Sequence, residues 1–282
     1  MFLLTVVLAA ALFIGAMWLL GPLLERIVGR AARRATEQPV PEGWLAVVCR
    51  QLPLIAAYAA EEQDELLRHA RDLLSIGSWE GAGGLELTTE MSLIIATQAV
   101  LLTWKRNEPA FPRLKEVLVY PSTFRPAPRF EWVADRDAEE RVPALGESWA
   151  SGTVVLAWDD VVRGAASPSD GHNVVLHEFA HQLDTADGIA DGIPALDMPA
   201  EPEAWHAMLL RAYGQLDDAA RAQESVPLDQ YALTNRAEFF AVATESFFER
   251  PRELRRTFPE LYRHLADFYR QDPAERLERR VG

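Results

Sequence analysis

The chain has 282 residues, of which 49% are hydrophobic and 25% are charged. This suffices for one large domain or two small ones with a buried core, and it excludes an intrinsically disordered chain. The formal net charge of -14 disfavours a nucleic-acid partner, because a phosphate backbone would be repelled. The single cysteine, Cys49, excludes an internal disulfide and a cysteine-built zinc site.

The first segment has the length and composition of a membrane-spanning helix. Phe2 to Leu24 contain no charge, and as a helix they would span about 34 Å against a hydrocarbon core of about 30 Å. Four arginines follow between residues 26 and 34 and no basic residue precedes them, so the positive-inside rule places the rest of the chain in the cytoplasm. A cleaved signal peptide is the alternative, but a basic n-region and a clear cleavage site are missing.

The sequence therefore predicts a single-pass protein of the inner (cytoplasmic) membrane. Residues 1–24 would form a transmembrane anchor, residues 25–41 a basic and polar linker, and residues 42–282 a body on the cytoplasmic side.

The first part of this body is predicted to be mostly helical. A helix from Ala60 to Leu74 carries acidic residues in its first turns and arginines later, which is the polarity that the helix dipole favours. Glycines at 81, 83 and 84 predict a turn before a helix that starts near Thr88 or Thr89. The apolar run from Met91 to Trp104 is too short to span a membrane and predicts a buried helix.

The second part combines strands and helices. Two β-branched runs, Val117 to Tyr120 and Thr153 to Trp158, predict strands. Turn and capping residues at 167–170 precede a helix expected from Gly171 to Ala186. Three more helices are expected at Pro202–Ala219, Arg236–Glu249 and Pro259–Gln271. Many helices with few strands indicate an α+β fold with a small sheet.

Residues 177–181 have the sequence HEFAH, an H-E-x-x-H motif within the expected helix. Residues four apart lie on one face of a helix, so both imidazoles can bind one metal ion while Glu178 reaches a metal-bound water. The chain has six histidines, and on the order of 0.02 chance matches to this pattern are expected. The motif therefore predicts a zinc hydrolase.

A catalytic zinc ion usually has three protein ligands, so a third ligand beside His177 and His181 is needed. Glu238 is the favoured candidate, because a carboxylate in a helix rich in large apolar side chains is costly to bury without a cation. Glu245, seven residues later on the same face, could orient a ligand or form a second buried pair. Alternatively, both glutamates could lie on a solvated flank of the helix.

Two aspartates close to the motif are weighed against Glu238. Asp187 lies six residues after His181, a spacing at which one class of zinc peptidases supplies its last ligand through a turn. That turn uses a glycine where this chain has Asp184, which adopts positive φ less readily, so Asp187 ranks second. Asp184 itself could orient a ligand imidazole, or it could lie in solvent at the helix end.

Three stretches of the chain match a known family. They are GHNVVLHEFAHQLD at residues 171–184, YALTNRAEFFA at 231–241 and FYRQDP at 268–273. On these motifs the chain from about Trp44 to Leu277 resembles the zinc peptidases of the Mlc titration factor A family. These are gluzincins, with a metal site similar to that of the anthrax lethal factor catalytic domain.

The resemblance implies a zincin-like metallopeptidase domain in which His177, His181 and Glu238 bind one zinc ion and Glu178 is the catalytic carboxylate. It also implies that Tyr231 stabilises the oxyanion, although by sequence alone this tyrosine could instead be a packing aromatic. The hydrophobic N-terminal segment departs from the family's soluble members, which affects the expected location and partners rather than the chemistry.

The expected activity is hydrolysis of peptide bonds in a peptide or protein substrate, with a metal-activated water and Glu178 as general base. The family name records binding to a transcriptional repressor, so sequestration of a transcriptional regulator, with catalysis secondary, is the alternative. A membrane-tethered scaffold that binds no zinc is a third interpretation.

Overall fold

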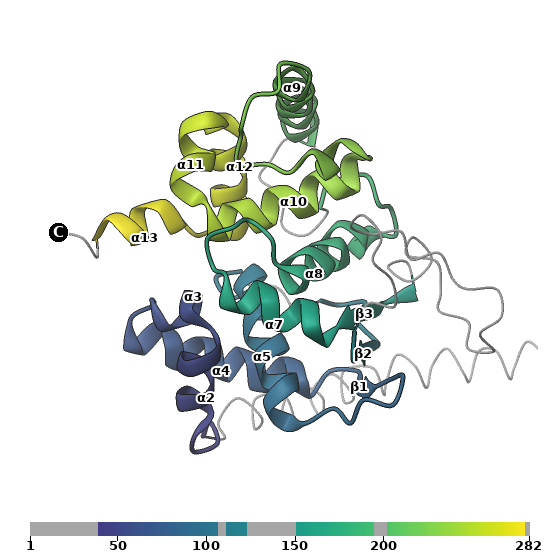
Figure 1. The fold of residues 1–282 in the computed structure, drawn as a ribbon, viewed down its shortest axis with the longest axis vertical. Coiled ribbons are helices and arrows are strands. Elements are labelled where there is room, and N and C mark those ends of the chain that lie inside the picture. Colours follow the sequence, from purple (N-terminus) through teal and green to yellow (C-terminus); the bar gives the residue numbers. More distant parts are fainter. Residues whose placement is uncertain (1–38, 107–110, 123–150, 195–201, 280–282) are drawn as a thin grey trace, which may run out of the picture. The chain divides into compact units, whose positions relative to one another are not determined.

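The computed structural model describes residues 39–106, 111–122, 151–194 and 202–279, and those from Glu42 onward belong to one compact unit (Figure 1). The elements in chain order are α2 (Trp44–Gln51), α3 (Pro53–Ala56), α4 (Ala60–Leu74), β1 (Ser78–Gly81), α5 (Thr89–Ala99), η1 (Val100–Leu102), β2 (Glu116–Tyr120), β3 (Thr153–Ala157), α7 (Trp158–Ala166), α8 (Val174–Asp184), η2 (Thr185–Asp187), α9 (Pro202–Arg221), η3 (Gln230–Leu233), α10 (Arg236–Glu249), α11 (Pro251–Thr257), α12 (Pro259–Tyr269) and α13 (Pro273–Arg279).

The three strands form a parallel sheet in the order β1-β2-β3. Parallel pairing of β1 with β2 requires a crossover, which α5 provides. Val117 and Val119 of β2 are fully buried and alternate with half-buried neighbours, as the period of two along a strand requires. β3 is buried along most of its length, because α8 packs against it.

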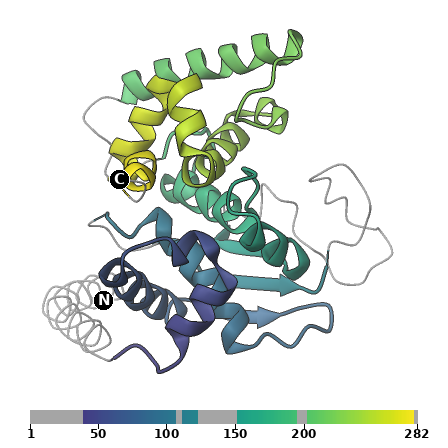
Figure 2. The ribbon, with the colours of Figure 1, turned by 60° about the vertical axis from the view of Figure 1, so that its left-hand side comes forward.

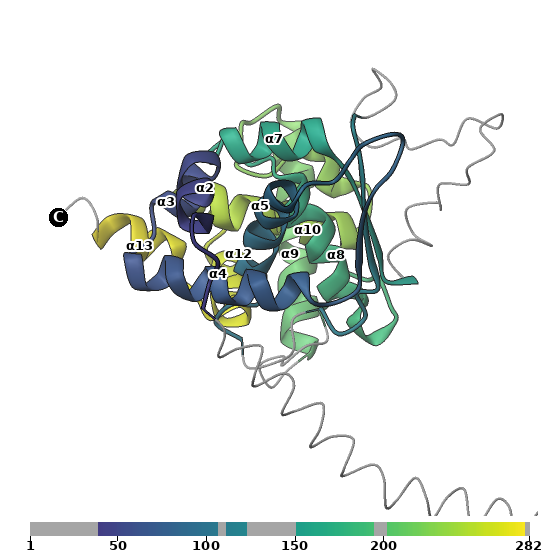
Figure 3. The same ribbon diagram turned by 90° about the horizontal axis from the view of Figure 1, so that it is seen from below.

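Helix α5 is buried all round and forms the core between the N-terminal helices and α8. Residues 91–99 are all buried, as are residues 100–102 in η1, so the predicted buried helix is confirmed. Thr88 starts α5, because its Oγ1 accepts a hydrogen bond from the Met91 N–H at 3.2 Å. α5 packs against α2, α4 and α8 and is seen near the middle of the helices in Figure 3.

Helices α8 and α10 lie against each other in the core, with β3 on the other side of α8 (Figures 1 and 2). Residues 237–249 of α10 are all buried. Trp205 of α9 and Phe268 of α12 pack edge-on against Phe240, with ring centroids 6.2 and 5.9 Å away. The two helices that carry the predicted metal ligands are therefore held on several sides.

The predicted bounds of Ala60–Leu74 and Arg236–Glu249 are confirmed, but the predicted start of the motif helix is wrong. α8 begins at Val174 rather than Gly171. Its N-cap is Asn173, whose Oδ1 accepts the Leu176 N–H at 3.1 Å, and not a residue of 167–170.

The short elements β1, α7, η3, α11 and α13 are not predicted by the sequence pattern. β1 is a mostly exposed edge strand without apolar alternation, so it lacks the usual signal. α11 and α13 begin at Pro251 and Pro273, which read in the sequence as helix breaks. Proline is favoured in the first turn, where its missing N–H costs no helical hydrogen bond.

The described fold is mostly helical with a small sheet, consistent with the predicted α+β class. The predicted membrane anchor at 1–24 lies outside the described residues. In the parts of the chain that the structure does describe, no helix is both long and apolar enough to span a bilayer.

Gly192 tests how tightly the segment after α8 packs on α10. It has φ +76°, and an added Cβ would lie 2.4 Å from the Arg236 carbonyl oxygen, whereas at Gly84, with φ +83°, it would meet nothing within 4 Å. We expect Gly84→Ala to lower the free energy of unfolding by about 1–2 kcal/mol, the cost of the left-handed conformation alone. Gly192→Ala should cost about 3 kcal/mol, because the clash is added. Urea unfolding measures both, and equal losses would contradict this packing.

Candidate metal centre

Two imidazoles on successive turns of α8 point at each other. His177 and His181 are 1% and 0% exposed, and their Nε2 atoms are 3.2 Å apart. The spacing of four residues puts both rings on the face of α8 that packs against α10. Both nitrogens are therefore directed to one buried place between the two helices.

Glu238 of α10 completes a group of three. Its Oε2 lies 3.0 Å from the His177 Nε2 and 3.5 Å from the His181 Nε2. Ligands at about 2.0–2.1 Å from a tetrahedral zinc ion are about 3.3 Å from each other, which matches these separations. The side-chain amide oxygen of Asn235 caps α10 by accepting the Glu238 N–H at 3.0 Å, so the first turn of α10 fixes this carboxylate.

The hydrogen bonding of His177 shows why the group fits a cation. Glu245 Oε1 lies 2.8 Å from its Nδ1, so Nδ1 carries the proton that is donated to this carboxylate. In the neutral ring the lone pair of Nε2 then faces the Glu238 carboxylate and the second imidazole. Such a cluster of acceptors is repulsive unless a positive charge lies between them, which is a chemical fit to a metal ion.

The pKa values of the three clustered residues also show that this place favours a positive charge. Burial lowers the pKa of His177, but hydrogen bonds to Glu238 and Glu245 outweigh burial and raise it to about 10. Burial lowers the pKa of His181 to about 4. Burial opposes ionisation of Glu238 as well, yet the two imidazoles lower its pKa to about 2. One proton held on His177 thus stands in for the charge that a divalent cation would supply.

Glu178 and Tyr231 adjoin this cluster. Glu178 is 3% exposed, and its charge contributes to raising the pKa of His177. The Tyr231 ring centroid lies 6.2 Å from that of His177. Burial raises the pKa of Tyr231, and the nearby carboxylates of Glu238 and Glu178 raise it further, so its hydroxyl stays protonated at neutral pH.

The position of Tyr231 is set by the turn that precedes α10. Asp229 Oδ1 accepts the Tyr231 N–H at 2.8 Å and thereby caps η3. The Tyr213 hydroxyl of α9 donates to the Leu233 carbonyl at the end of the same turn. Tyr231 is thus placed beside the cluster by contacts from both sides of η3.

The two aspartates weighed as alternatives lie elsewhere. Asp187 is exposed at the end of η2, where its Oδ1 accepts the Ile189 N–H at 2.8 Å, and it does not join the cluster. Asp184 is 0% exposed, so a solvated helix-end carboxylate is wrong, and burial raises its pKa to about 7. Neither oxygen of Asp184 hydrogen-bonds to an imidazole; Glu245 orients His177 instead.

Residues that the sequence did not single out surround Glu245. Asn173, Glu249 and Gln98 are buried and linked by hydrogen bonds of 2.9 and 3.0 Å. Asn173 could have been found as a capping residue just before the motif helix, whereas Gln98 and Glu249 carry no signal in the sequence.

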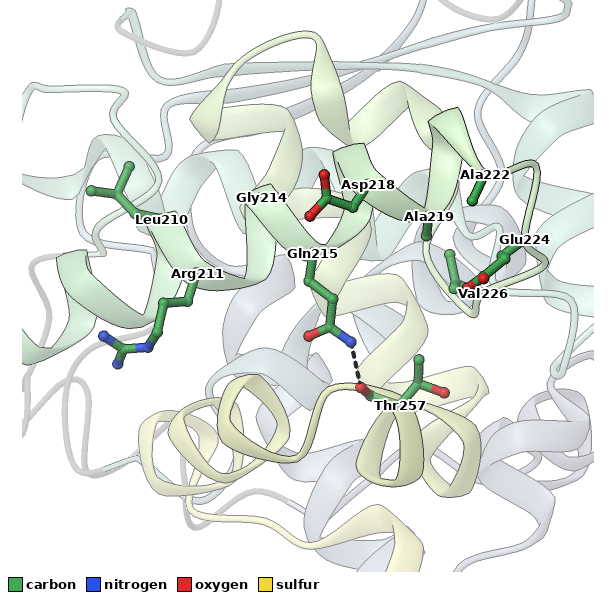
Figure 4. A pocket seen from close by; sticks show the side chains of 10 residues that line it. All are labelled: Leu210, Arg211, Gly214, Gln215, Asp218, Ala219, Ala222, Glu224, Val226 and Thr257. Carbon is green, nitrogen blue, oxygen red and sulfur yellow. Dashed lines mark hydrogen bonds between the residues drawn. The ribbon is translucent and has the colours of Figure 1, made fainter.

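An open groove lies apart from these residues, along α9. Its lining comes from α9, from the segment that follows it and from Thr257, whose carbonyl accepts a 2.8 Å hydrogen bond from Gln215 Nε2 (Figure 4). None of the predicted site residues lines this groove. The buried cluster between α8 and α10 is therefore the better candidate for chemistry.

Comparison with known families agrees with this geometry. The family model described as glucose-regulated metallo-peptidase M90 matches residues 27–270. The chain belongs to this M90 family. Membership implies a metal ion, and His177, His181 and Glu238 are a group among the described residues that could hold one.

Relatives of this M90 chain cover most of its length. An uncharacterized protein of Synechocystis sp. is 34% identical over 242 residues, which are 84% of this chain and 86% of the relative. Mlc titration factor A of Serratia proteamaculans is 35% identical over 81% of this chain and 87% of its own length. That of Yersinia pestis is 34% identical, with 81% and 84% covered. The predicted resemblance to the Mlc titration factor A family is thereby confirmed.

Proposed function

We propose that the protein is a zinc-dependent peptidase in which His177, His181 and Glu238 bind one zinc ion. The observation that carries the proposal is the convergence of three ligand atoms, 3.0 to 3.5 Å apart, in a buried place of a metallopeptidase-family chain. Two histidines and one glutamate form a known catalytic zinc set, which leaves a fourth position for water or substrate. When bound, zinc acts as a Lewis acid that lowers the pKa of water and polarises a carbonyl.

The chain's own residues supply proton transfer and orientation. Glu178, which follows a ligand directly in the motif, accepts the proton of the attacking water and passes it to the leaving amine. The Tyr231 hydroxyl, kept protonated by its surroundings, donates a hydrogen bond to the oxygen that becomes negative as the carbonyl is attacked. Glu245 holds the tautomer of His177 in which the proton is on Nδ1, so that Nε2 is directed toward Glu238 and His181 as a metal ligand.

Glu238→Ala tests the ligand set. Two imidazoles alone hold zinc weakly, so we expect the purified variant to lose most of its zinc at neutral pH, while the wild type keeps about one ion per chain. Elemental analysis measures the ratio. Glu260→Ala, which removes an exposed carboxylate paired with Arg211, is the control and should keep its zinc. Full occupancy in Glu238→Ala would move the third ligand elsewhere.

Glu178→Gln tests the general base. The amide cannot accept a proton, yet the three ligands are untouched, so the variant should retain zinc and lose peptide hydrolysis by at least about 10²-fold. Cleavage of a peptide library by wild type and variant, with zinc content determined on the same samples, checks this. Wild-type cleavage by the variant would remove Glu178 from the mechanism.

Tyr231→Phe tests oxyanion stabilisation. Only the hydroxyl is lost, so zinc content and KM should change little while kcat falls by about 10²-fold. Steady-state kinetics separate the two constants. An unchanged kcat would leave Tyr231 as a packing aromatic.

A regulatory role is the second candidate, because relatives at 34–35% identity are called Mlc titration factor A. In this role the chain would bind and sequester a transcriptional regulator, with catalysis secondary. Glu178→Gln discriminates between peptidase activity and sequestration. Because sequestration needs no general base, the variant would keep the biological effect only if sequestration causes it. We also propose attachment to the cytoplasmic face of the inner membrane through residues 1–24, on the basis of their uncharged length and the arginines that follow.

A further inference from the structure

Two buried carboxylates of α10 face the segment just before α8. Glu245 and Glu249 are 6% and 5% exposed and lie one helical turn apart. Within the described parts of the chain, neither forms an ion pair with a lysine or an arginine. Burying two carboxyl groups is costly unless hydrogen-bond donors surround them, and burial raises the pKa of Glu249 to about 8. The neighbouring residues must therefore supply hydrogen-bond donors to both groups.

The donors come from residues 171–173. Glu249 Oε2 accepts the N–H groups of Gly171 and His172, both at 3.1 Å, and its Oε1 accepts the Asn173 Nδ2 at 3.0 Å. Glu245 divides its two oxygens in the same manner. Its Oε2 accepts the Asn173 N–H, and its Oε1 is left for the His177 Nδ1.

Asn173 uses every polar group it has. Besides the two contacts to α10, its Nδ2 donates to Gln98 Oε1 of α5 at 2.9 Å. Its Oδ1 caps α8 at Leu176, and its carbonyl accepts the His177 N–H at 2.9 Å. One side chain thus joins α5, α8 and α10 at the start of the metal-binding helix.

We propose that Glu249, acting through Asn173, is a positioning residue for the metal centre. By holding residues 171–173, Glu249 sets the place of the Asn173 N–H. That N–H fixes the rotation of Glu245, and Glu245 in turn directs the Nε2 of His177 toward the metal. This inference rests on the proposed zinc site and extends it by two further residues, neither of which touches metal or substrate.

The hydrogen bond from Asn173 Nδ2 to Glu249 Oε1 can be tested by exchanging its donor and its acceptor. In Glu249→Gln an amide would face the Asn173 amide. In Asn173→Asp a carboxylate would face Glu249, while the cap of α8 is kept, since aspartate caps as well as asparagine. In the double variant Asn173→Asp/Glu249→Gln the hydrogen bond returns with reversed polarity, and the number of carboxyl groups equals that of the wild type. Glu260→Gln, which changes a carboxylate that pairs with Arg211 at the surface, is the matched control.

The measurement is the zinc dissociation constant of the full-length protein, from competition with a chelator, alongside urea unfolding of each variant. Each single variant should bind zinc about tenfold more weakly, the double variant should recover part of that loss, and Glu260→Gln should match the wild type. Single variants that are destabilised but bind zinc as the wild type does would overturn the inference and leave the zinc site standing. A double variant whose loss of zinc-binding free energy equals the sum of the losses in the two single variants would also overturn the inference.

If Glu249→Gln fails to fold, Asn173→Asp and the double variant still decide, because the double variant should bind zinc more tightly than Asn173→Asp alone. A wild type that binds no zinc would overturn the proposed function and this inference together. The two failures are therefore distinguishable in one experiment.

Discussion

The structure depends on three hydrogen-bond acceptor atoms that are buried close together. Two imidazole nitrogens and a carboxylate oxygen meet between α8 and α10, where solvent does not reach to separate them. Without a positive charge at their centre this arrangement would be repulsive, and burial would be costly. A cation turns the same arrangement into a favourable one, so part of the stability of the α8–α10 contact should depend on the bound metal.

The rest of the fold holds these atoms in place. α8 packs against β3 and α5, and α10 packs against aromatic side chains of α9 and α12. Each element that carries a proposed site residue begins at a capping side chain: Asn173 for α8, Asp229 for η3 and Asn235 for α10. Caps fix where a helix starts, and so they fix the rotation at which its first turns present their side chains.

The sequence predicted the features that have a local signal. Spacing of four put two histidines on one helix face, and the apolar run at residues 91–104 indicated the buried helix α5. The large apolar side chains around Glu238 favoured it as a buried ligand on α10, which is buried along residues 237–249. The failures have physical reasons as well. β1 is an exposed edge strand without alternation, and the start of α8 was set by Asn173 rather than by the turn residues at 167–170. The partnership of Gln98 and Glu249 with Asn173 spans more than 70 residues, and it exists only once three helices have packed.

The proposed zinc ion lies between His177, His181 and Glu238. X-ray absorption at the zinc edge, on the full-length protein purified without added metal, tests this most directly. We expect four-coordinate zinc with two imidazole nitrogens and oxygen ligands at about 2.0–2.1 Å. An absent zinc edge, or zinc without imidazole scattering, would contradict it.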